Sequence, residues 1–158
     1  MKKVFIYVGH SNWGKSMALK VLTGNNSHQQ TVQIGKYNVR VRKMSNDDSG
    51  KGLFDWVNQI SQLNYDRFVI AFCPKVPPAN GNATLEQATA LKILNTLSLQ
   101  NELYFFVQEE QYSSCGTDRI TQIEINWLQN FGTVFILKGQ NTDVQRADEF
   151  QKFIIQHI

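Results

Sequence analysis

The sequence has little of the features that mark several specialised classes of protein. It has two cysteines, Cys73 and Cys115, and neither stands at a metal-ligand spacing. We therefore expect reduced thiols in a cytoplasmic protein, without a disulfide framework or a zinc site. No apolar run reaches the ~20 residues that a membrane-spanning helix needs. The short run after Met1-Lys2-Lys3 is expected to be a first strand and not a signal peptide.

A strong excess of one charge is also missing. The 16 basic and 13 acidic side chains leave a net charge of +3, which is too mild to indicate nucleic acid as a partner. A small basic group lies between Lys36 and Lys43, where Arg40 and Arg42 alternate with valines. Alternate residues of a strand share a face, so we expect this group to form a solvated face of a sheet and not a binding patch.

Apolar side chains, in contrast, are plentiful. They make up 42% of the chain and include ten Phe, five Tyr and three Trp. This content excludes a chain that is disordered throughout. A length of 158 residues suits one domain with a proper core, and no linker, repeat or low-complexity segment divides it.

The most informative stretch is a glycine-rich motif that follows the first apolar run. Val4–Val8 leads into Gly9-His10-Ser11-Asn12-Trp13-Gly14-Lys15-Ser16, and a helix-forming run over Met17–Leu22 closes at Gly24. Gly-x-x-x-x-Gly-Lys-Ser between a buried strand and a helix is the phosphate-binding P-loop, or Walker A, pattern. The sequence therefore predicts a nucleotide site here. The alternative is a glycine-rich turn that binds nothing.

Each part of the motif has a physical reason. Gly9 and Gly14 allow tight turns and a close approach to a ligand, while loop amides and the helix N-terminus attract phosphate oxygens. Lys15 adds a full charge over the β- and γ-phosphates, and Ser16 offers a hydroxyl to Mg²⁺. The residues of this motif that we expect to contact the nucleotide are Gly9, Ser11, Asn12, Trp13, Gly14, Lys15, Ser16 and Met17.

Hydrophobic periodicity and turn residues predict the remaining elements. A hairpin is expected from Thr31–Ile34 and Tyr37–Met44, followed by a flexible polar loop over Ser45–Gly52. The later strands are predicted at Phe68–Cys73, Leu103–Val107 and Thr133–Leu137. Helices are predicted at Leu53–Leu63 and at Asp143–His157. Two more are expected with caps, one at Leu85–Leu97 after Thr84 and one from Thr117 or Asp118 to Asn130. This order predicts an α/β fold: a mainly parallel six-stranded sheet with one antiparallel edge hairpin and helices on both faces. The P-loop would then lie where such sheets bind ligands, at the C-terminal ends of the strands.

The element order and the P-loop residues together resemble a known family. The predicted element order, with a hairpin between the first two helices, is similar to that of a Ras-like G domain. Asn12 and Leu22-Thr23-Gly24 resemble the Era/EngA branch of GTPases, although Ser11 and Trp13 stand where Pro and Val are usual. The resemblance in element order extends over the whole chain. The resemblance in individual residues is confined to the first quarter of the chain and one later motif. The resemblance implies a three-layer P-loop NTPase fold that binds GTP or GDP with Mg²⁺, and ATP is not excluded.

The later motif is Asp47-Asp48-Ser49-Gly50, which fits the family's Asp-x-x-Gly. Through the resemblance, Asp47 would hold the Mg²⁺ shell with Ser16, from the end of a strand beside the P-loop strand, and the Gly50 N–H would reach the γ-phosphate. Thr31 would be a switch threonine that meets the same ion. The alternatives are a polar turn at residues 47–50 and an ordinary threonine at the start of a strand.

Two positions depart from the family. Gln108-Glu109-Glu110-Gln111 stands where the guanine-reading Asn-Lys-x-Asp is expected. Gln108 could replace the Asn, but no aspartate stands where the guanine N1 and N2 donors would be met, so the base preference stays open. Lys51 follows Asp-x-x-Gly, where a water-positioning Gln is often found, and an ammonium group orients water poorly. We therefore expect hydrolysis to be slow or to need a partner.

Three functions remain open from the sequence. The first is a GTPase-like switch that meets a protein partner through segments near Thr31 and Asp47–Gly52. The second is a small ATP-using kinase, with Glu109 or Glu110 as metal anchor and Arg119 on a lid. The third is a degenerate P-loop scaffold that binds nucleotide weakly or not at all and no longer hydrolyses it. The acid nearest Ser16 distinguishes the first two, because Asp47 indicates the switch and Glu109 the kinase.

Overall fold

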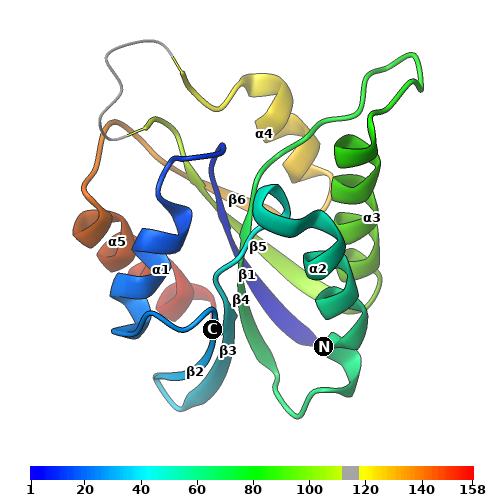
Figure 1. The fold of residues 1–158 in the computed structure, drawn as a ribbon. Helices are drawn as coiled ribbons and strands as arrows, with labels where there is room; N and C mark the ends of the chain where they lie inside the picture. Colours follow the sequence, from blue (N-terminus) through cyan, green and yellow to red (C-terminus); the bar gives the residue numbers. More distant parts are fainter. Residues whose placement is uncertain (112–117) are drawn as a thin grey trace.

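The computed structural model describes residues 1–111 and 118–158, and a six-stranded sheet forms its centre (Figure 1). The strands are β1 (Lys2–Val8), β2 (Gln29–Ile34), β3 (Tyr37–Arg42), β4 (Arg67–Phe72), β5 (Asn101–Gln108) and β6 (Thr133–Leu137). They lie in the order β2-β3-β4-β1-β5-β6, and of these neighbouring pairs β2–β3 alone is antiparallel. The predicted fold class, a mainly parallel sheet with one antiparallel edge hairpin, is confirmed.

Helices cover both faces of this sheet. One face carries α1 (Lys15–Thr23) and α5 (Asp143–His157), and the other carries α2 (Asn46–Gln59), α3 (Leu85–Gln100) and α4 (Gln122–Gln129), as Figure 1 shows. Alternation along β1 divides the core: Val4, Ile6 and Val8 face α2, α3 and α4, while Phe5 and Tyr7 face α1 and α5. All five side chains are fully buried, as a central parallel strand requires. Within the described ranges, no helix is both long and apolar enough to cross a bilayer.

The strand order corrects one expectation about the metal site. Asp47 was expected at the end of a strand beside the P-loop strand, but β4 lies between β3 and β1. Phe68 pairs with Val4 on one side and with Arg40 on the other. The apolar run of β4 is buried on both faces of the sheet, so it takes a central place. Two strand spacings, roughly 10 Å, therefore separate β3 from β1.

The segment Ser45–Gly52 was predicted as a flexible loop, and this is wrong. Ser45 is the N-cap of α2: its Oγ accepts a hydrogen bond from Asp47 N at 3.3 Å, and the Asp48 carboxylate accepts one from Ser45 N at 3.0 Å. These reciprocal bonds form a capping box, which fixes a helix start. The helix is interrupted once, at Ser49, which has φ −158° and ψ 97°. The Asp-x-x-Gly motif thus lies in the first turns of a kinked helix.

The start of α4 also differs from the prediction. Thr121 caps this helix through a capping box with Glu124. Thr117, one of the two expected caps, lies outside the described residues, and Asp118 precedes the helix by several residues. In contrast, the predicted Thr84 cap of α3 and the predicted span of α5 are confirmed.

The basic group of the hairpin is not a solvated face. Arg42 and Lys43 are buried, because β4 and the connection between α1 and β2 cover the end of β3. Lys43 N donates to His28 O at 2.8 Å, and Lys43 Nζ donates to Asn25 O at 2.6 Å. Only the outer part of the group, with Arg40 hydrogen-bonded to Thr31 and Gln29 on β2, fits the expectation of a solvated strand face.

Candidate functional site

The P-loop connects the end of β1 to the first residue of α1, at the C-terminal edge of the sheet (Figure 1). Two of its residues have left-handed backbone conformations, Asn12 with φ 64° and Gly14 with φ 81°. Asparagine tolerates this region, whereas at Gly14 an added Cβ would also lie 2.8 Å from Nη2 of Arg146. The left-handed backbone therefore favours glycine at Gly14, and a larger residue would also have to displace the end of the Arg146 side chain.

The N-terminus of α1 lacks a capping side chain. Gly14 occupies the N-cap position, and within residues 1–111 and 118–158 no side-chain cap bonds the start of this helix. The first N–H groups of a helix have no partner within it, and together they present partial positive charge. An anion bound at this end of α1 would accept hydrogen bonds from these N–H groups and would balance the partial positive charge.

Trp13 was expected among the residues that contact the nucleotide, and most of its side chain is in the core. The residue is 4% exposed and belongs to the apolar cluster under α2, α3 and α4. Its ring lies 4.6 Å from the ring of His10, which in turn pairs with Glu124 of α4 at 2.7 Å. The indole thus anchors the loop to the core and leaves the start of α1 open.

A cavity of ≈ 260 Å³ opens in front of α1. Its lining joins the P-loop to the start of α2, and comprises Asn12, Gly14, Lys15, Ser16, Lys43, Asp47 and Asp48. Lys15 Nζ donates to His10 O at 2.9 Å and to Asp47 Oδ2 at 3.4 Å. The predicted combination of Lys15, Ser16 and Asp47 is therefore brought together at one cavity.

This donor set fits a magnesium–phosphate complex. Mg²⁺ is usually held by one or two carboxylates, water and substrate phosphates, not by a cage of protein ligands alone. Ser16 and Asp47 supply a hydroxyl and a carboxylate at the same cavity. Among the described residues, no group of three or more His, Cys, Asp or Glu could hold a metal ion without a ligand.

A second cavity of ≈ 210 Å³ lies on the other side of the P-loop. Its lining comprises Asn12, Trp13, Gly14, Met17, Gln111, Asp143 and Arg146. Arg146 is 3% exposed, and its guanidinium donates to Gly14 O at 3.3 Å and to Asn141 O at 2.6 Å. Asn12 and Gly14 border both cavities, so the P-loop forms the ridge between them.

Gln108 lies against the P-loop, but its amide is already occupied. Its Nε2 donates to Trp13 O at 3.2 Å and to Glu110 O at 2.9 Å, and its Oε1 accepts from the Tyr7 hydroxyl at 3.0 Å. Burial raises the pKa of Tyr7, so this hydroxyl keeps its proton and remains a donor. With both N–H groups engaged, the Gln108 side chain joins the loop to β5 and has no donor left for a base.

Replacing Gln108 with leucine should therefore destabilise the fold. The change removes the partner of the buried Tyr7 hydroxyl, of the buried Trp13 carbonyl and of the partly buried Glu110 carbonyl. We expect the free energy of unfolding to fall by about 3 kcal/mol. Urea denaturation measures the difference, with the exposed Gln129→Leu as control, for which we expect a change within ~0.5 kcal/mol. Equal stability of the two variants would contradict this role.

Two further predicted residues are not brought to the cavity. Thr31 lies within β2 and opposite Arg40, and its hydroxyl bonds that of Tyr65 at 2.8 Å. Arg40 pairs with Phe68, which is at the level of Val4, so Thr31 lies several residues below the strand ends. Gly50 faces α3 instead, where an added Cβ would meet Thr89 Cγ2 at 3.2 Å.

The acids expected for a kinase are engaged elsewhere. Glu110 pairs with Arg119 at 3.2 Å, and a Glu109 carboxylate oxygen accepts from Gly139 N at 3.4 Å. Neither acid lines the cavity with Ser16, whereas Asp47 does. Asp47, and not Glu109 or Glu110, is therefore the acid that shares a cavity with Ser16, and this is the arrangement expected from the sequence for a switch.

Sequence reasoning missed several residues that build the site. Asn46 exchanges two hydrogen bonds with the main chain of Cys73, at 2.7 and 2.8 Å, and so joins the start of α2 to the end of β4. Arg146 lines one P-loop cavity from α5, and Lys43 lines the other from the position after β3. Only Asn46 had a local signal, its place within the Ser45-x-x-Asp48 capping pattern. The other contacts depend on the packing of distant segments.

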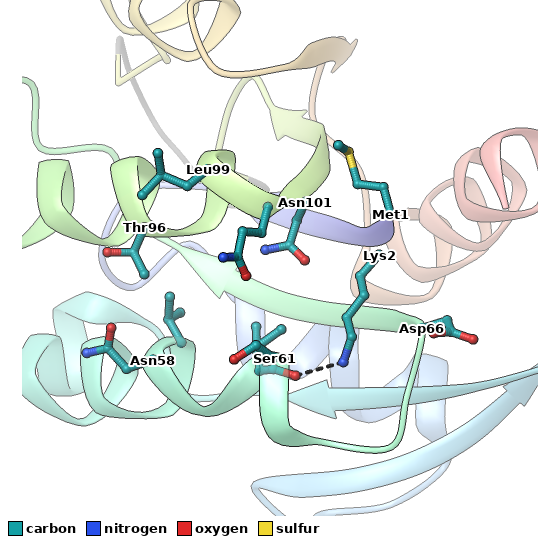
Figure 2. Close-up of a pocket in the computed structure, with 11 residues that line it drawn as sticks. Met1, Lys2, Asn58, Ser61, Asp66, Thr96, Leu99 and Asn101 are labelled. Carbon is teal, nitrogen blue, oxygen red and sulfur yellow. Dashed lines mark hydrogen bonds between the residues drawn. The ribbon is translucent and has the colours of Figure 1, made fainter.

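A larger hollow, ≈ 460 Å³, lies at the opposite edge of the sheet. Figure 2 shows its lining, which includes Met1, Lys2, Asn58 and Thr96. The Lys2 ammonium donates to Ile60 O and Leu63 O at 2.9 and 2.8 Å, so its charge is already used in the fold. The P-loop lies at the other end of β1, and this hollow therefore lies away from the candidate site.

Comparisons with known proteins do not identify a family for this chain. No family model matches the chain, and no curated protein matches it significantly. One solved structure that resembles it is translation elongation factor SelB from Methanococcus maripaludis, in complex with the GTP analogue GppNHp, at 13% identity and a TM-score of 0.49. The match covers 98% of this chain and 33% of the SelB chain, so this chain spans about a third of that length. What the site binds has to be inferred from its own geometry.

Proposed function

We propose that the protein binds a nucleoside triphosphate with Mg²⁺ around the P-loop, as a GTPase-like switch. The observation that supports this most is the pair of cavities that share Asn12 and Gly14. A nucleotide has two chemically different ends, a polyphosphate with its metal and a flat base. One cavity has two lysines, a hydroxyl and two carboxylates. The other has two amide side chains, a carboxylate, a guanidinium and part of an indole.

The polyphosphate would lie in the cavity of Lys15, Ser16 and Asp47. The free N–H groups at the start of α1 would donate to phosphate oxygens, and Lys15 would exchange its bonds with His10 O and Asp47 for bonds to phosphate. Mg²⁺, when bound, would neutralise part of the phosphate charge. Asp47 would then be free to hold the ion's water shell.

The base would lie in the second cavity, beside Gln111 and Asp143. Guanine presents two adjacent donors, N1–H and the N2 amino group, and a carboxylate can accept from both. Gln108-Glu109-Glu110-Gln111 carries no aspartate at the guanine-reading position, but Asp143 lines the second cavity from the start of α5. We therefore favour guanine over adenine.

Hydrolysis would be slow or dependent on a protein partner. Lys51 is exposed and lines a groove of ≈ 510 Å³ between α2 and α3, not the phosphate cavity. Asp47 borders both the groove and the cavity. A partner that binds Asp47–Gly52 in this groove would therefore touch a residue that also meets the phosphate site. We place the proposed partner contact there and not at Thr31.

Thermal unfolding tests this proposal. Ligand at 100 times its Kd stabilises a protein by about 2.7 kcal/mol, which for a domain of this size raises the Tm by about 5–10 °C. We expect such shifts with GTP and GDP in Mg²⁺, and smaller shifts with ATP. Asp143→Asn should reduce the GTP shift toward that of ATP, while the exposed Asp148→Asn on the same helix should not. If no nucleotide shifts the Tm at millimolar concentration, the proposal is contradicted, and the scaffold function becomes the remaining alternative.

A further inference from the structure

Lys43 is a buried cation that pairs with no carboxylate in the described part of the chain. It follows β3, is 1% exposed, and lines the same cavity as Lys15 and Ser16. Its ammonium donates to Asn25 O at 2.6 Å, and among the ion pairs found in the described ranges, none includes it. Burying an ammonium group is costly unless an opposite charge compensates it. The fold therefore retains a charge at this cavity that a carbonyl oxygen alone does not balance.

The place of Lys43 along the sheet indicates which part of a nucleotide it meets. The cavity with Gln111 and Asp143 lies toward β5 and β6, the P-loop follows β1, and Lys43 follows β3 on the other side. A nucleotide with its base near Asp143 and its phosphates over the P-loop would extend toward β3. The group nearest Lys43 would then be the last phosphate of the chain.

We propose that Lys43 is a second phosphate-binding lysine, which contacts the terminal phosphate of a nucleoside triphosphate and so distinguishes it from the diphosphate. This inference rests on the proposed nucleotide site. Phosphate oxygens would supply the negative charge that Lys43 lacks, through charge-assisted hydrogen bonds. Separately, burial and then the nearby charge of Lys20 lower the pKa of Lys43, and a bound anion would oppose both effects.

The same contact would transmit the presence of the terminal phosphate. Lys43 holds the connection between α1 and β2 at two points, Asn25 O through its side chain and His28 O through its backbone. A phosphate that draws the ammonium away would release the first of these points and keep the second. The residues around Asn25 would thereby report whether the terminal phosphate is present.

The test compares Kd values for GTP and GDP, measured by titration calorimetry in Mg²⁺, in wild type and in Lys43→Met. We expect the variant to lose about tenfold or more in GTP affinity and less than twofold in GDP affinity. Lys20→Met, which changes a nearby charge that does not line the cavity, should change both affinities alike. Without ligand, Lys43→Met should be as stable as wild type or more stable, because an uncompensated buried charge is replaced by an apolar group.

Each outcome is decisive. Equal losses for GTP and GDP, or no loss for either, would overturn the role of Lys43 while Lys15 variants still test the nucleotide site. A fall in the Tm of ligand-free Lys43→Met with unchanged affinities would make the lysine purely structural. If Lys43→Met does not fold, Lys43→Gln keeps an N–H donor without the charge, and it should show the same selective loss of GTP affinity. No nucleotide binding by wild type would overturn the proposed function itself.

Discussion

Lys15→Ala is expected to lower the affinity for a magnesium–nucleoside triphosphate by about 100-fold or more. Lys15 is a side chain of the phosphate cavity that already donates two hydrogen bonds, to His10 O and to Asp47, and can redirect them to phosphate. Hydrogen bonds to charged groups are worth about 1.5–3 kcal/mol each, and 1.4 kcal/mol is tenfold in affinity. Titration calorimetry of the variant with GTP in Mg²⁺ measures the loss.

The fold should survive this change. Asp47 lies in the first turn of α2, and the capping box of Ser45 and Asp48 fixes this turn without any contact from Lys15. Lys20→Ala is the matched control, because Lys20 lies on the same helix and does not line the cavity. An affinity in Lys15→Ala equal to that of the control, with both proteins folded by circular dichroism, would contradict the phosphate role of the loop.

Asp47→Asn is expected to abolish most of the magnesium dependence of nucleotide binding. In wild type, added Mg²⁺ should raise the affinity for GTP, because Asp47 and Ser16 border one cavity and can share the ion's shell. Asparagine keeps the shape of the side chain but removes the charge that the ion requires. Binding measured with Mg²⁺ and with EDTA gives the ratio of affinities, which should fall toward one in the variant.

Asp55→Asn serves as the control for this experiment. Asp55 is exposed on the same helix and lies outside the phosphate cavity, so its replacement should leave the magnesium ratio unchanged. A full magnesium dependence in Asp47→Asn would exclude Asp47 from the metal shell. The metal site would then move to another acid, such as the Glu109 region that the kinase alternative requires.

Local patterns predicted much of the fold and part of the site. The alternation of apolar strands and helices indicated a mainly parallel sheet, and Gly9–Ser16 indicated the turn from β1 into α1, which the backbone at Asn12 and Gly14 makes with left-handed residues. Both depend on residues close in sequence, whose conformational preferences are strong. The combination of Lys15, Ser16 and Asp47 at one cavity was expected from the resemblance and is present in the geometry.

The rest could not be predicted because it depends on the packing of distant segments. No local sequence pattern indicates the order of the strands, in which β4 lies between β3 and β1. It decides that Thr31 is remote from the cavity and that Lys43 lines it. Arg146 likewise meets Gly14 across 132 positions of sequence. The start of α2 is different, because Ser45-x-x-Asp48 carried a capping signal that the competing Asp-x-x-Gly interpretation concealed.

Amide NMR can show residue by residue whether the main chain around Gly9–Ser16 holds a polyphosphate. Titration of ¹⁵N-labelled protein with a non-hydrolysable GTP analogue and Mg²⁺ follows each N–H separately. We expect large, saturable shifts for the amides of Gly14, Lys15 and Ser16, because they would become hydrogen-bonded to phosphate oxygens. Saturable binding that leaves these three amides unperturbed, or no binding at millimolar ligand, would contradict it.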